Sequence, residues 1–440
     1  MSRTGDGGAA ECYGEPMIHL PGNWYGDSAL PPPPRPPLDG DMTADVCIVG
    51  GGMTGCSAAL HLAERGYAIR LIDSHHIGQG ASGRSGGQLI AGYGAEISSL
   101  GRSIGPAHRQ ALWDLGVEAV DLTRSLIETH AIACDFVPGH VHVGFKPRHM
   151  DGLRHMQDEW MSFGHDALDW IDGPTIRTVV QSDAYLGGLR DRRAGHLHPL
   201  NYTLGLARAA EAAGAILHED TAYKSHAETA QGVTVVTNRG TIRAKWLILA
   251  GNAYIWGKAR GLGSTIMPVG TYMIATEPLG EDRAKALIPG NEAIADVAFV
   301  LNYYRRSADH RLLFGGGVSY SRLDPLSIKA TLRKVMLRYF PQLSDVAVTH
   351  GWGGNVAITI NRMPHFGRLG RQILFAHGYS GHGVAVTGLA GRLMAEVIGG
   401  TEERFDVIAR LPHLPFPGGS VLRTPLLILG TTWARLRDLL

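Results

Sequence analysis

The hydrophobic pattern near the start of the chain predicts a strand, a helix and a second strand in close succession. Asp45–Val49 is a short apolar run with β-branched residues, which is typical of a buried strand. Cys56–Arg65 has apolar residues at helical spacing and ends at Gly66, a common helix stop. Ala68–Ile72 is again apolar and strand-like. This order is that of a βαβ unit, whose two strands are parallel.

The turn after the first strand is rich in glycine, and an acid follows the second strand. Asp73 lies 23 residues after the first of these glycines. The first glycine of such a turn allows the chain to turn tightly, the second lets the backbone approach a pyrophosphate, and the third lets the helix pack closely against the strand. The helix N-terminus faces the phosphates, and the acid accepts a hydrogen bond from a ribose. The unit predicts dinucleotide binding by Gly50, Gly51, Gly52, Met53, Thr54, Gly55, Asp73 and Ser74.

The next block has a different pattern and predicts a separate domain. Pro106–His130 reads as a long amphipathic helix, Cys134–Phe145 as strand-like, and Arg148–Phe163 and Pro174–Ser182 as helices. Because strands and helices do not alternate regularly here, we assign this block to a second domain.

Later segments return to the first pattern. Trp246–Ala250 is an apolar strand that enters a glycine turn, which makes the dinucleotide domain discontinuous. The other predicted helices are Leu200–Ala213, Leu326–Phe340 and Ala385–Gly399, and the other predicted strands are Ala215–His218, Gly232–Asn238, Thr241–Ala244, Met267–Glu277, Asp296–Arg305, Leu312–Gly315 and Ile373–Ala376.

The predicted fold class is α/β (α+β overall), a discontinuous Rossmann-like domain with an inserted antiparallel-sheet domain. Residues 41–105, 196–262 and 350–410 form the first domain, and residues 106–195 and 263–349 the second. Residues 1–40 are an N-terminal extension, in which Trp24 and Tyr25 are expected to dock on the body. Its proline-rich part is either a stiff connection or a ligand for a recognition domain. Residues 411–440 are a tail, read as a docked helix or a membrane contact.

Composition excludes several classes of function. The 440 residues have a formal net charge of +1, so nothing points to nucleic acid or an anionic membrane. We expect no transmembrane helix, because no apolar run is long enough, and no signal peptide. The 4 cysteines form no CxxC pair and the 21 histidines no spaced ligand set, so no metal site is expected. The cysteine pattern suits a reducing, cytoplasmic location.

Two further glycine-rich segments resemble a known family. The segments are GASGRSGGQ at Gly80–Gln88 and GYSGHGV at Gly378–Val384; with AGNAY at Ala250–Tyr254 and GHLHPL at Gly195–Leu200, they resemble the D-amino-acid-oxidase-like flavin oxidoreductases over nearly the whole chain. The resemblance is strongest to the γ-glutamylputrescine-oxidising members of polyamine catabolism. It implies FAD as cofactor and an antiparallel substrate sheet above the flavin.

The resemblance implies FAD contacts in two segments besides the βαβ unit, Gly80–Gln88 and Gly378–Val384. The Gly80–Gln88 segment would pass beside the pyrophosphate and the isoalloxazine, and the helix after Gly378 would stabilise negative charge on the reduced flavin with its N-terminus. We expect non-covalent FAD, because no cysteine follows Cys134 and the Gly80–Gln88 segment contains no histidine. The candidate contacts are Gly80, Ala81, Ser82, Gly83, Arg84, Gly86, Gly87, Gln88, Ala250, Gly251, Asn252, Gly378, Tyr379, Ser380, Gly381, His382, Gly383 and Val384.

The implied reaction transfers hydride from the carbon beside an amine nitrogen to flavin N5, and hydrolysis of the imine then gives an aldehyde. A free alkyl amine is mostly protonated at neutral pH, so the pocket must favour its neutral form by desolvation or a nearby acceptor. His382, His198, Trp352 and Arg84 are the candidate catalytic residues. Each has a plainer alternative: core packing for His198 and Trp352, and solvent exposure for Arg84.

Other readings stay open at this stage. The substrate is γ-glutamylputrescine or a related polyamine, or else an N-methyl or D-amino acid. The electron acceptor is dioxygen, giving hydrogen peroxide, or another acceptor, because Leu312–Gly317 lacks the lysine that sarcosine-oxidising relatives carry there. A nicotinamide-dependent dehydrogenase and a non-enzymatic flavoprotein are the more distant alternatives. The oligomeric state is not predicted.

Overall fold

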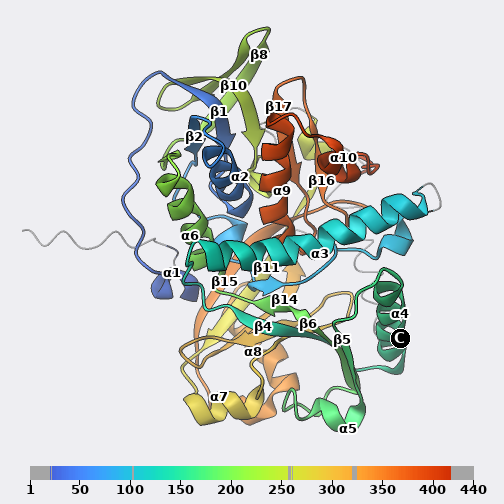
Figure 1. The fold of residues 1–440 in the computed structure, drawn as a ribbon. Coiled ribbons are helices and arrows are strands. Elements are labelled where there is room, and N and C mark those ends of the chain that lie inside the picture. Colours follow the sequence, from blue (N-terminus) through green and yellow to red (C-terminus); the bar gives the residue numbers. More distant parts are fainter. Residues whose placement is uncertain are drawn as a thin grey trace, which may run out of the picture.

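The computed structural model describes residue 20 and residues 22–101, 104–255, 259, 261–319 and 325–417. The tail helix predicted within 424–440 and residues 1–19 and 21 of the N-terminal extension lie outside these residues. Figure 1 shows two parts stacked on each other, a helix-covered sheet and a second sheet, with the long helix α3 (Pro106–Thr129) lying between them.

The first sheet contains the βαβ unit. Its main path is β16-β17-β10-β1-β2-β7, and β1 pairs in parallel with both β10 and β2. A ribbon of β8 and β9 extends from β10. The strands are β1 Met42–Val49, β2 Ile69–Ile72, β7 Ile216–His218, β8 Tyr223–Thr229, β9 Gly232–Thr237, β10 Thr241–Leu249, β16 His365–Arg368 and β17 Ile373–His377.

Helices cover one face of this sheet closely. α2 (Met53–Ala63) contacts both α6 (Pro199–Ala212) and α9 (Gly383–Ile398), and α3 packs on α9. A Cβ at Gly391 would lie 2.4 Å from the backbone nitrogen of Ala58, so only glycine allows α9 to approach α2 this closely. α10 (Glu403–Ala409) packs against α9 and β16. Because α3 packs on α9, it belongs with the first sheet, although its sequence pattern predicted the second domain.

The second sheet is antiparallel except for the parallel pair β12 and β4. Its path is β15-β11-β14-β13-β12-β4-β6-β3, with β5 paired to β6. The strands are β3 Gln88–Leu89, β4 Val137–Gly144, β5 Leu168–Ile171, β6 Gly187–His196, β11 Met267–Thr276, β12 Ala293–Asp296, β13 Tyr303–Arg306, β14 Leu312–Ser319 and β15 Val348–Ile358. The remaining helices are α1 Trp24–Ser28, α4 Pro147–Ser162, α5 Gly173–Ile176, α7 Glu281–Leu287 and α8 Ile328–Tyr339, with short 3-10 turns η1 Ala81–Gly83, η2 Ile97–Leu100, η3 Asn252–Ile255, η4 Leu262–Ser264 and η5 Pro341–Leu343.

Several predicted elements are corrected by the structure. Thr241–Ala244 and Trp246–Ala250 belong to one strand, β10. The segment Asp296–Arg305 covers the end of β12 and most of β13, which pair as antiparallel neighbours. The helix predicted at Pro174–Ser182 is the single turn α5. β15 pairs with β11 in the second sheet, so residues 350–358 do not belong to the dinucleotide domain as predicted.

The two faces of the second sheet have different surroundings. Val141, Tyr304 and Phe314 lie in a hydrophobic cluster with Leu332 and Met336 of α8. The opposite face includes Met273, Leu313 and Trp352, which join the main core of the first part. Because side chains alternate along a strand, His140 and His142 of β4 lie on this opposite face, toward the first part.

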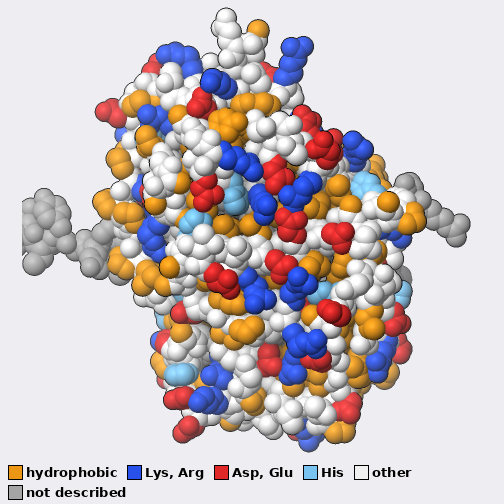
Figure 2. All heavy atoms as spheres, viewed as in Figure 1, with side chains coloured by type: hydrophobic (Ala, Val, Ile, Leu, Met, Phe, Trp, Pro, Cys, Tyr) orange, Lys and Arg blue, Asp and Glu red, His pale blue; other side chains and the backbone are white. Residues whose placement is uncertain are grey.

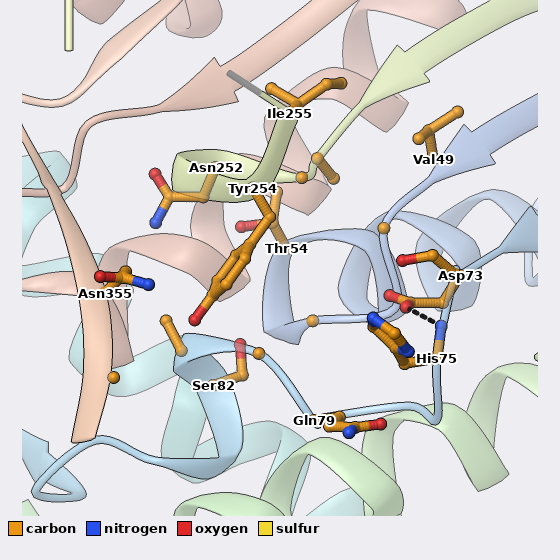
Figure 3. Close-up of a pocket in the computed structure, with 18 of the residues that line it drawn as sticks. Val49, Thr54, Asp73, His75, Gln79, Ser82, Asn252, Tyr254, Ile255 and Asn355 are labelled. Atoms are coloured by element: carbon orange, nitrogen blue, oxygen red, sulfur yellow. Dashed lines mark hydrogen bonds between the residues drawn. The ribbon is translucent and has the colours of Figure 1, made fainter. Parts of the chain in front are cut away.

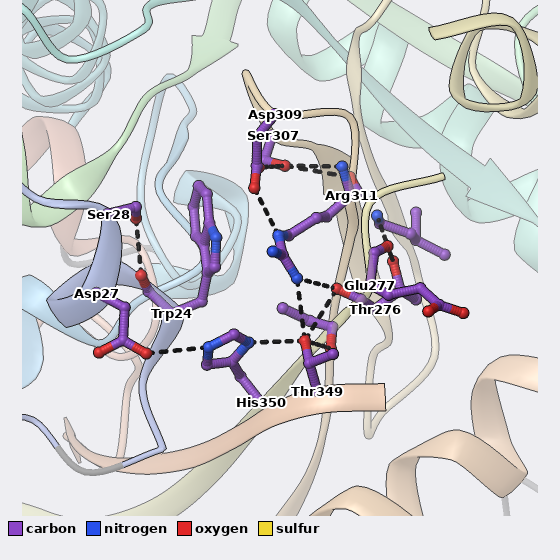
Figure 4. A network of polar contacts seen from close by, with 12 residues as sticks. Trp24, Asp27, Ser28, Thr276, Glu277, Ser307, Asp309, Arg311, Thr349 and His350 are labelled. Carbon is purple, nitrogen blue, oxygen red and sulfur yellow. Dashed lines mark hydrogen bonds and ion pairs between the residues drawn. The ribbon is translucent and has the colours of Figure 1, made fainter. Parts of the chain in front are cut away.

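The N-terminal extension docks on the body through its aromatic residues, as the sequence predicted. Trp24 and Tyr25 in α1 are buried. Figure 4 shows Asp27 next to His350, with 3.0 Å between Asp27 Oδ2 and His350 Nε2. In the proline-rich part, Arg35 is buried and pairs with Glu211 at 2.6 Å. This segment is therefore fixed to the body at a defined point.

On the face shown in Figure 2, basic and acidic side chains are interspersed. Among the described residues, no helix combines the length and the apolarity needed to cross a membrane.

Candidate cofactor and active site

A cavity of about 650 Å³ opens where the strands of the first sheet end at their carboxyl edge. Such an edge is where open parallel sheets bind ligands. Figure 3 shows Thr54, Asp73, Ser82 and Asn252 around it, with Tyr254 extending into its middle. Of the predicted contacts, Gly50, Gly52, Thr54, Asp73, Ser74, Gly80, Ala81, Ser82, Arg84, Ala250, Gly251, Asn252 and Tyr379 line this cavity.

The first glycine turn has the geometry that its sequence predicts. Gly50 has φ +112°, which favours glycine. A Cβ at Gly55 would lie 1.9 Å from the carbonyl oxygen of Gly50, so α2 can start this close to β1 only with glycine there. A Cβ at Gly52 would lie 2.8 Å from Ser82 Oγ, in the gap between α2 and the Gly80–Gln88 segment. Gly55 therefore serves packing, whereas Gly52 keeps the cavity wall free of side chain.

Asp73, directly after β2, links the end of that strand to the turn that follows β1. Its Oδ2 accepts a hydrogen bond from the backbone N–H of Gly51 at 2.7 Å, and its Oδ1 accepts one from His75 at 2.9 Å. Burial raises the pKa of the Asp73 carboxyl. Each oxygen keeps acceptor capacity, and the side chain lines the cavity, so it suits recognition of a ribose hydroxyl.

The Gly80–Gln88 segment packs too tightly to admit a side chain at Gly83, Gly86 or Gly87. A Cβ would lie 2.6 Å from the Tyr303 ring at Gly86 and 2.1 Å from the carbonyl oxygen of Leu197 at Gly87. The segment is tied to the first turn by the hydrogen bond from Met53 N–H to Ser82 Oγ, 3.0 Å long. It is thus an ordered part of the cavity wall.

Arg84 connects this segment to the second sheet. Its Nε donates to the carbonyl oxygen of Gln79 at 2.8 Å and its Nη1 to that of Gly353 at 3.1 Å. The side chain lines the cavity while both bonds hold it along the wall. These contacts give Arg84 a role in positioning the wall.

The Gly378–Val384 turn leads from β17 into α9. Three positive φ angles occur within it, at Gly378 (+72°), Ser380 (+53°) and Gly381 (+95°). The backbone N–H of Gly378 donates to Asn252 Oδ1 at 3.0 Å, and Tyr379 Oη lies 2.7 Å from Thr54 Oγ1. These contacts bring together the turns after β17 and β10 and the first turn of α2, which far-apart stretches of the sequence supply.

His382 is the N-cap residue of α9, but its imidazole makes no capping hydrogen bond. Burial, with the nearby His142 and Arg362, lowers the pKa of His382 to about 4. The imidazole is therefore neutral at neutral pH and retains an acceptor nitrogen. It is not among the residues that line the 650 Å³ cavity.

The other two candidate catalytic residues lie away from the cavity lining. His198 is buried, its Nδ1 accepts the backbone N–H of Asn201 at 3.1 Å as the cap of α6, and its Nε2 lies 3.1 Å from Ser28 Oγ. Trp352 is buried against Tyr25, and its Nε1–H donates to the carbonyl oxygen of Arg84 at 3.0 Å. Both sets of contacts match the packing alternatives.

Several residues at or near the cavity were not predicted from the sequence. Tyr254, Asn355 and Gln79 line the cavity without having been proposed as contacts. His140 and His142 were missed although their spacing in VPGHVHVG places both on one face of a predicted strand. That alternation was a usable signal.

Comparison with known proteins now decides the family. The model of the family described as "DAO: FAD dependent oxidoreductase" matches residues 45–397. The chain belongs to this DAO family. Its cofactor is FAD, and the protein is an FAD-dependent oxidoreductase. The described turns fit such a cofactor, because their glycines leave only backbone at the cavity wall.

Two curated relatives extend over nearly the whole chain. The chain is 42% identical over 423 residues to gamma-glutamylputrescine oxidoreductase of Escherichia coli strain K12, covering 96% of this chain and 99% of the relative. It is 39% identical over 421 residues to the probable oxidoreductase OrdL of Haemophilus influenzae, covering 94% and 97%. Among solved structures, the fold resembles that of glycine oxidase from Geobacillus kaustophilus, with a TM-score of 0.71, 21% identity and coverage of 85% of this chain and 100% of that one.

Proposed function

We propose that this DAO-family protein oxidises an amine, with γ-glutamylputrescine or a related polyamine derivative as substrate. The carbon beside the amine nitrogen loses hydride, and hydrolysis of the resulting imine gives an aldehyde. The observation that supports this most strongly is the 42% identity to the gamma-glutamylputrescine oxidoreductase along 99% of that relative. FAD supplies the hydride acceptor at N5, and we propose dioxygen as the final electron acceptor, with hydrogen peroxide as product.

The residues of the cavity suggest how the cofactor is held. We propose that Asp73 and the turn from Gly50 to Gly55 bind the ADP half. Gly80–Gln88 would pass along the pyrophosphate and the flavin, and the N-terminus of α9 would face the flavin. No histidine or cysteine occurs in Gly80–Gln88, and Cys47, Cys56 and Cys134 are buried. FAD is therefore held non-covalently in this proposal.

His382 provides the acceptor that the amine needs. A protonated amine cannot release hydride from the adjacent carbon, because its lone pair is bound to the proton. A neutral imidazole at the start of α9 does not repel an incoming ammonium and can accept its proton. Desolvation also lowers the pKa of the substrate ammonium, which offsets part of the pKa difference that the low pKa of His382 creates.

A second candidate is oxidation of an N-methyl or small amino acid. Glycine oxidase from Geobacillus kaustophilus supports it through its fold, and at 22% identity over 382 residues. The stretch Leu312–Gly317 on β14 lacks the lysine that sarcosine-oxidising relatives carry there, so the electron acceptor of this protein need not be that of those relatives; at Gly315 a Cβ would lie 2.1 Å from the Tyr303 ring.

The test is an anaerobic flavin-reduction panel with γ-glutamylputrescine, putrescine, spermidine, sarcosine and D-alanine. The purified protein should be yellow, and acid denaturation should release free FAD into the supernatant. Rapid bleaching by γ-glutamylputrescine, with slower bleaching by sarcosine and D-alanine, is the expected result. Bleaching by the amino acids alone would select the second candidate. Bleaching by none would indicate a non-enzymatic flavoprotein.

A further inference from the structure

The proline-rich part of the N-terminal extension turns two buried side chains toward the body. In the run Pro31–Pro37, Arg35 is the only residue that is not proline. Arg35 and Leu38 are 6% and 2% exposed, whereas the prolines of the run are exposed or half-buried. Three residues per turn is the period of the polyproline II conformation, so positions 35 and 38 fall on one side of such a segment. The segment therefore presents one cation and one apolar side chain to the body.

Arg35 pairs with two carboxylates. Its Nε donates to Glu211 Oε1 at 2.6 Å and its Nη2 to Glu211 Oε2 at 2.9 Å. Its Nη1 donates to Glu219 Oε1 at 3.3 Å. Glu219 is 7% exposed, so loss of the guanidinium would leave a buried carboxylate with only the His76 imidazole beside it, which is costly. Arg35 thus supplies the permanent positive charge next to Glu219.

Glu219 in turn holds the loop that follows Asp73. Its Oε1 also accepts the backbone N–H of Ile77 at 2.9 Å, and its Oε2 lies 2.7 Å from His76 Nδ1. Because an ionised carboxylate only accepts, His76 Nδ1 is the donor. The loop rests on the first glycine turn, since a Cβ at Gly51 would lie 2.3 Å from Ile77 Cδ1. One buried carboxylate therefore fixes two successive residues of this loop against the turn.

Both contacts of the proline-rich segment lead to the lining of the cofactor cavity. The backbone N–H of Leu38 donates to Thr221 Oγ1 at 2.9 Å. Thr221 lines the cavity, and its own N–H donates to the backbone carbonyl of Asp73 at 2.7 Å. His75 and Gln79, in the loop just described, line the cavity as well. The segment is thus bonded to two parts of the cavity wall that adjoin Asp73.

We propose that residues 31–38 are a clasp that holds the adenosine end of the FAD site in its binding form, with Arg35 as the positioning residue. The inference rests on the proposed placement of the ADP half at Asp73 and not on which amine is oxidised. Arg35 is not among the residues that line the cavity, so it acts through Glu219 on the loop His75–Gln79. The prolines limit the freedom of the undocked segment, so docking it costs little conformational entropy.

The test measures the Kd for FAD by titrating the full-length apoprotein and following flavin fluorescence. Arg35→Met removes the charge beside Glu219, so the Kd should rise about tenfold or more. The double variant Arg35→Met, Glu219→Gln contains no unpaired carboxylate at this place. Its glutamine can still accept from the Ile77 N–H, so the Kd should return to within about threefold of wild type. Such a recovery is expected only if Arg35 acts through Glu219.

Arg404→Met is the matched control. Arg404 also pairs with two carboxylates, those of Glu118 and Glu396, and none of these three residues lines the cofactor cavity. The control should lower the Tm and leave the Kd for FAD unchanged. If Arg35→Met does not fold, Arg35→Gln, which keeps an amide donor for Glu219, takes its place with the same expected order of Kd values.

Three results would overturn the clasp: a wild-type Kd in Arg35→Met, a raised Kd that the double variant does not reverse, and an equal rise in Arg404→Met. Asp73→Ala tests the placement of the ADP half separately. If Asp73→Ala binds FAD as tightly as wild type, the placement is wrong and the clasp has no site to hold. If Asp73→Ala binds FAD weakly while Arg35→Met binds it normally, only the clasp is wrong.

Discussion

Arg305 Nη2 donates a hydrogen bond to the phenolic oxygen of Tyr25 at 3.1 Å, across 280 positions of the chain. The Nε of the same guanidinium donates to the carbonyl oxygen of Gly86 at 2.9 Å, and Nη1 donates to that of Arg306 at 3.2 Å. Tyr25 and Arg305 are both buried. The N-terminal helix α1 therefore holds the Gly80–Gln88 segment in place through the buried Arg305 guanidinium, which is bonded to neutral oxygens on both.

Tyr25→Phe should weaken FAD binding. The substitution removes one acceptor from a buried charged donor, a loss of about 1–3 kcal/mol, and it loosens the support of Gly86. We expect the Kd for FAD to rise about tenfold, which corresponds to 1.4 kcal/mol, with a lower Tm. The apoprotein titrated with FAD gives the Kd.

Tyr67→Phe is the matched control for this prediction. This substitution also removes a part-buried hydrogen bond, from Tyr67 Oη to the carbonyl oxygen of Ile398 at 3.3 Å, but at a place that has no contact with the Gly80–Gln88 segment among the described hydrogen bonds. It should lower stability without changing the Kd for FAD. An equal change of Kd in the two variants would show that general destabilisation, and not the contact with Arg305, causes the effect.

Gly52→Val should abolish FAD retention while the protein stays folded. A Cβ there would lie 2.8 Å from Ser82 Oγ, and the valine methyl groups would extend into the gap where the pyrophosphate is proposed to lie. The ratio of flavin to protein absorbance measures retention, and circular dichroism measures folding. Gly152→Ala in the exposed part of α4, where a Cβ meets nothing within 4 Å, should keep full FAD content. Normal FAD content in Gly52→Val would refute this placement of the pyrophosphate.

The strand–turn–helix unit and the long helices could be predicted because their patterns are local. β6 could not: its residues Arg190, Asp191, Arg192 and Arg193 are polar, and a polar run does not predict a central strand. Asp191 is buried there beside His165, which lies 26 positions away in the sequence and has its Nε2 3.1 Å from Asp191 Oδ1. Tertiary contacts override the local pattern in this strand.

The sequence predicts the parts of the site that are formed by glycine-rich turns. It does not predict the roles of side chains whose surroundings depend on tertiary packing. The three glycine segments were found from the sequence, and residues from each line the cavity. His198 was selected because histidine often acts as a base, but only the fold shows that it caps α6 and lies 3.1 Å from Ser28 of the N-terminal helix. A single sequence does not indicate which buried histidine faces a helix end.

His198→Asn should preserve turnover and make the protein more resistant to acid. Asparagine is a good N-cap, so the bond to the backbone of Asn201 can be kept. Burial lowers the pKa of His198 to about 3 in the folded state. The contribution of neutral His198 to the free energy of unfolding is therefore fully present above its unfolded pKa near 6.5, and it is lost as pH falls toward and through its folded pKa.

Removing this group removes its share of acid lability. We expect kcat within about twofold of wild type, since no described contact joins His198 to the cavity lining, and a lower pH midpoint of unfolding by tryptophan fluorescence. A large loss of kcat with unchanged stability would instead return His198 to the catalytic residues.

Arg362→Gln should discriminate between substrates with and without a carboxylate. The positive charge of Arg362 lowers the pKa of His382, the proposed base. γ-Glutamylputrescine carries a carboxylate that a nearby guanidinium would bind, and putrescine carries none. The variant should lose about tenfold or more in kcat/KM for γ-glutamylputrescine, because a hydrogen bond to a charged group contributes about 1.5–3 kcal/mol, with little change for putrescine.

Without the cation His382 protonates more readily, so the acid limb of the kcat/KM profile should move to higher pH. Arg368→Gln, which loses ion pairs with Glu402 and Asp406 instead, is the control and should show neither effect. Equal losses for both substrates in Arg362→Gln would show that this arginine supports the fold and does not select the substrate.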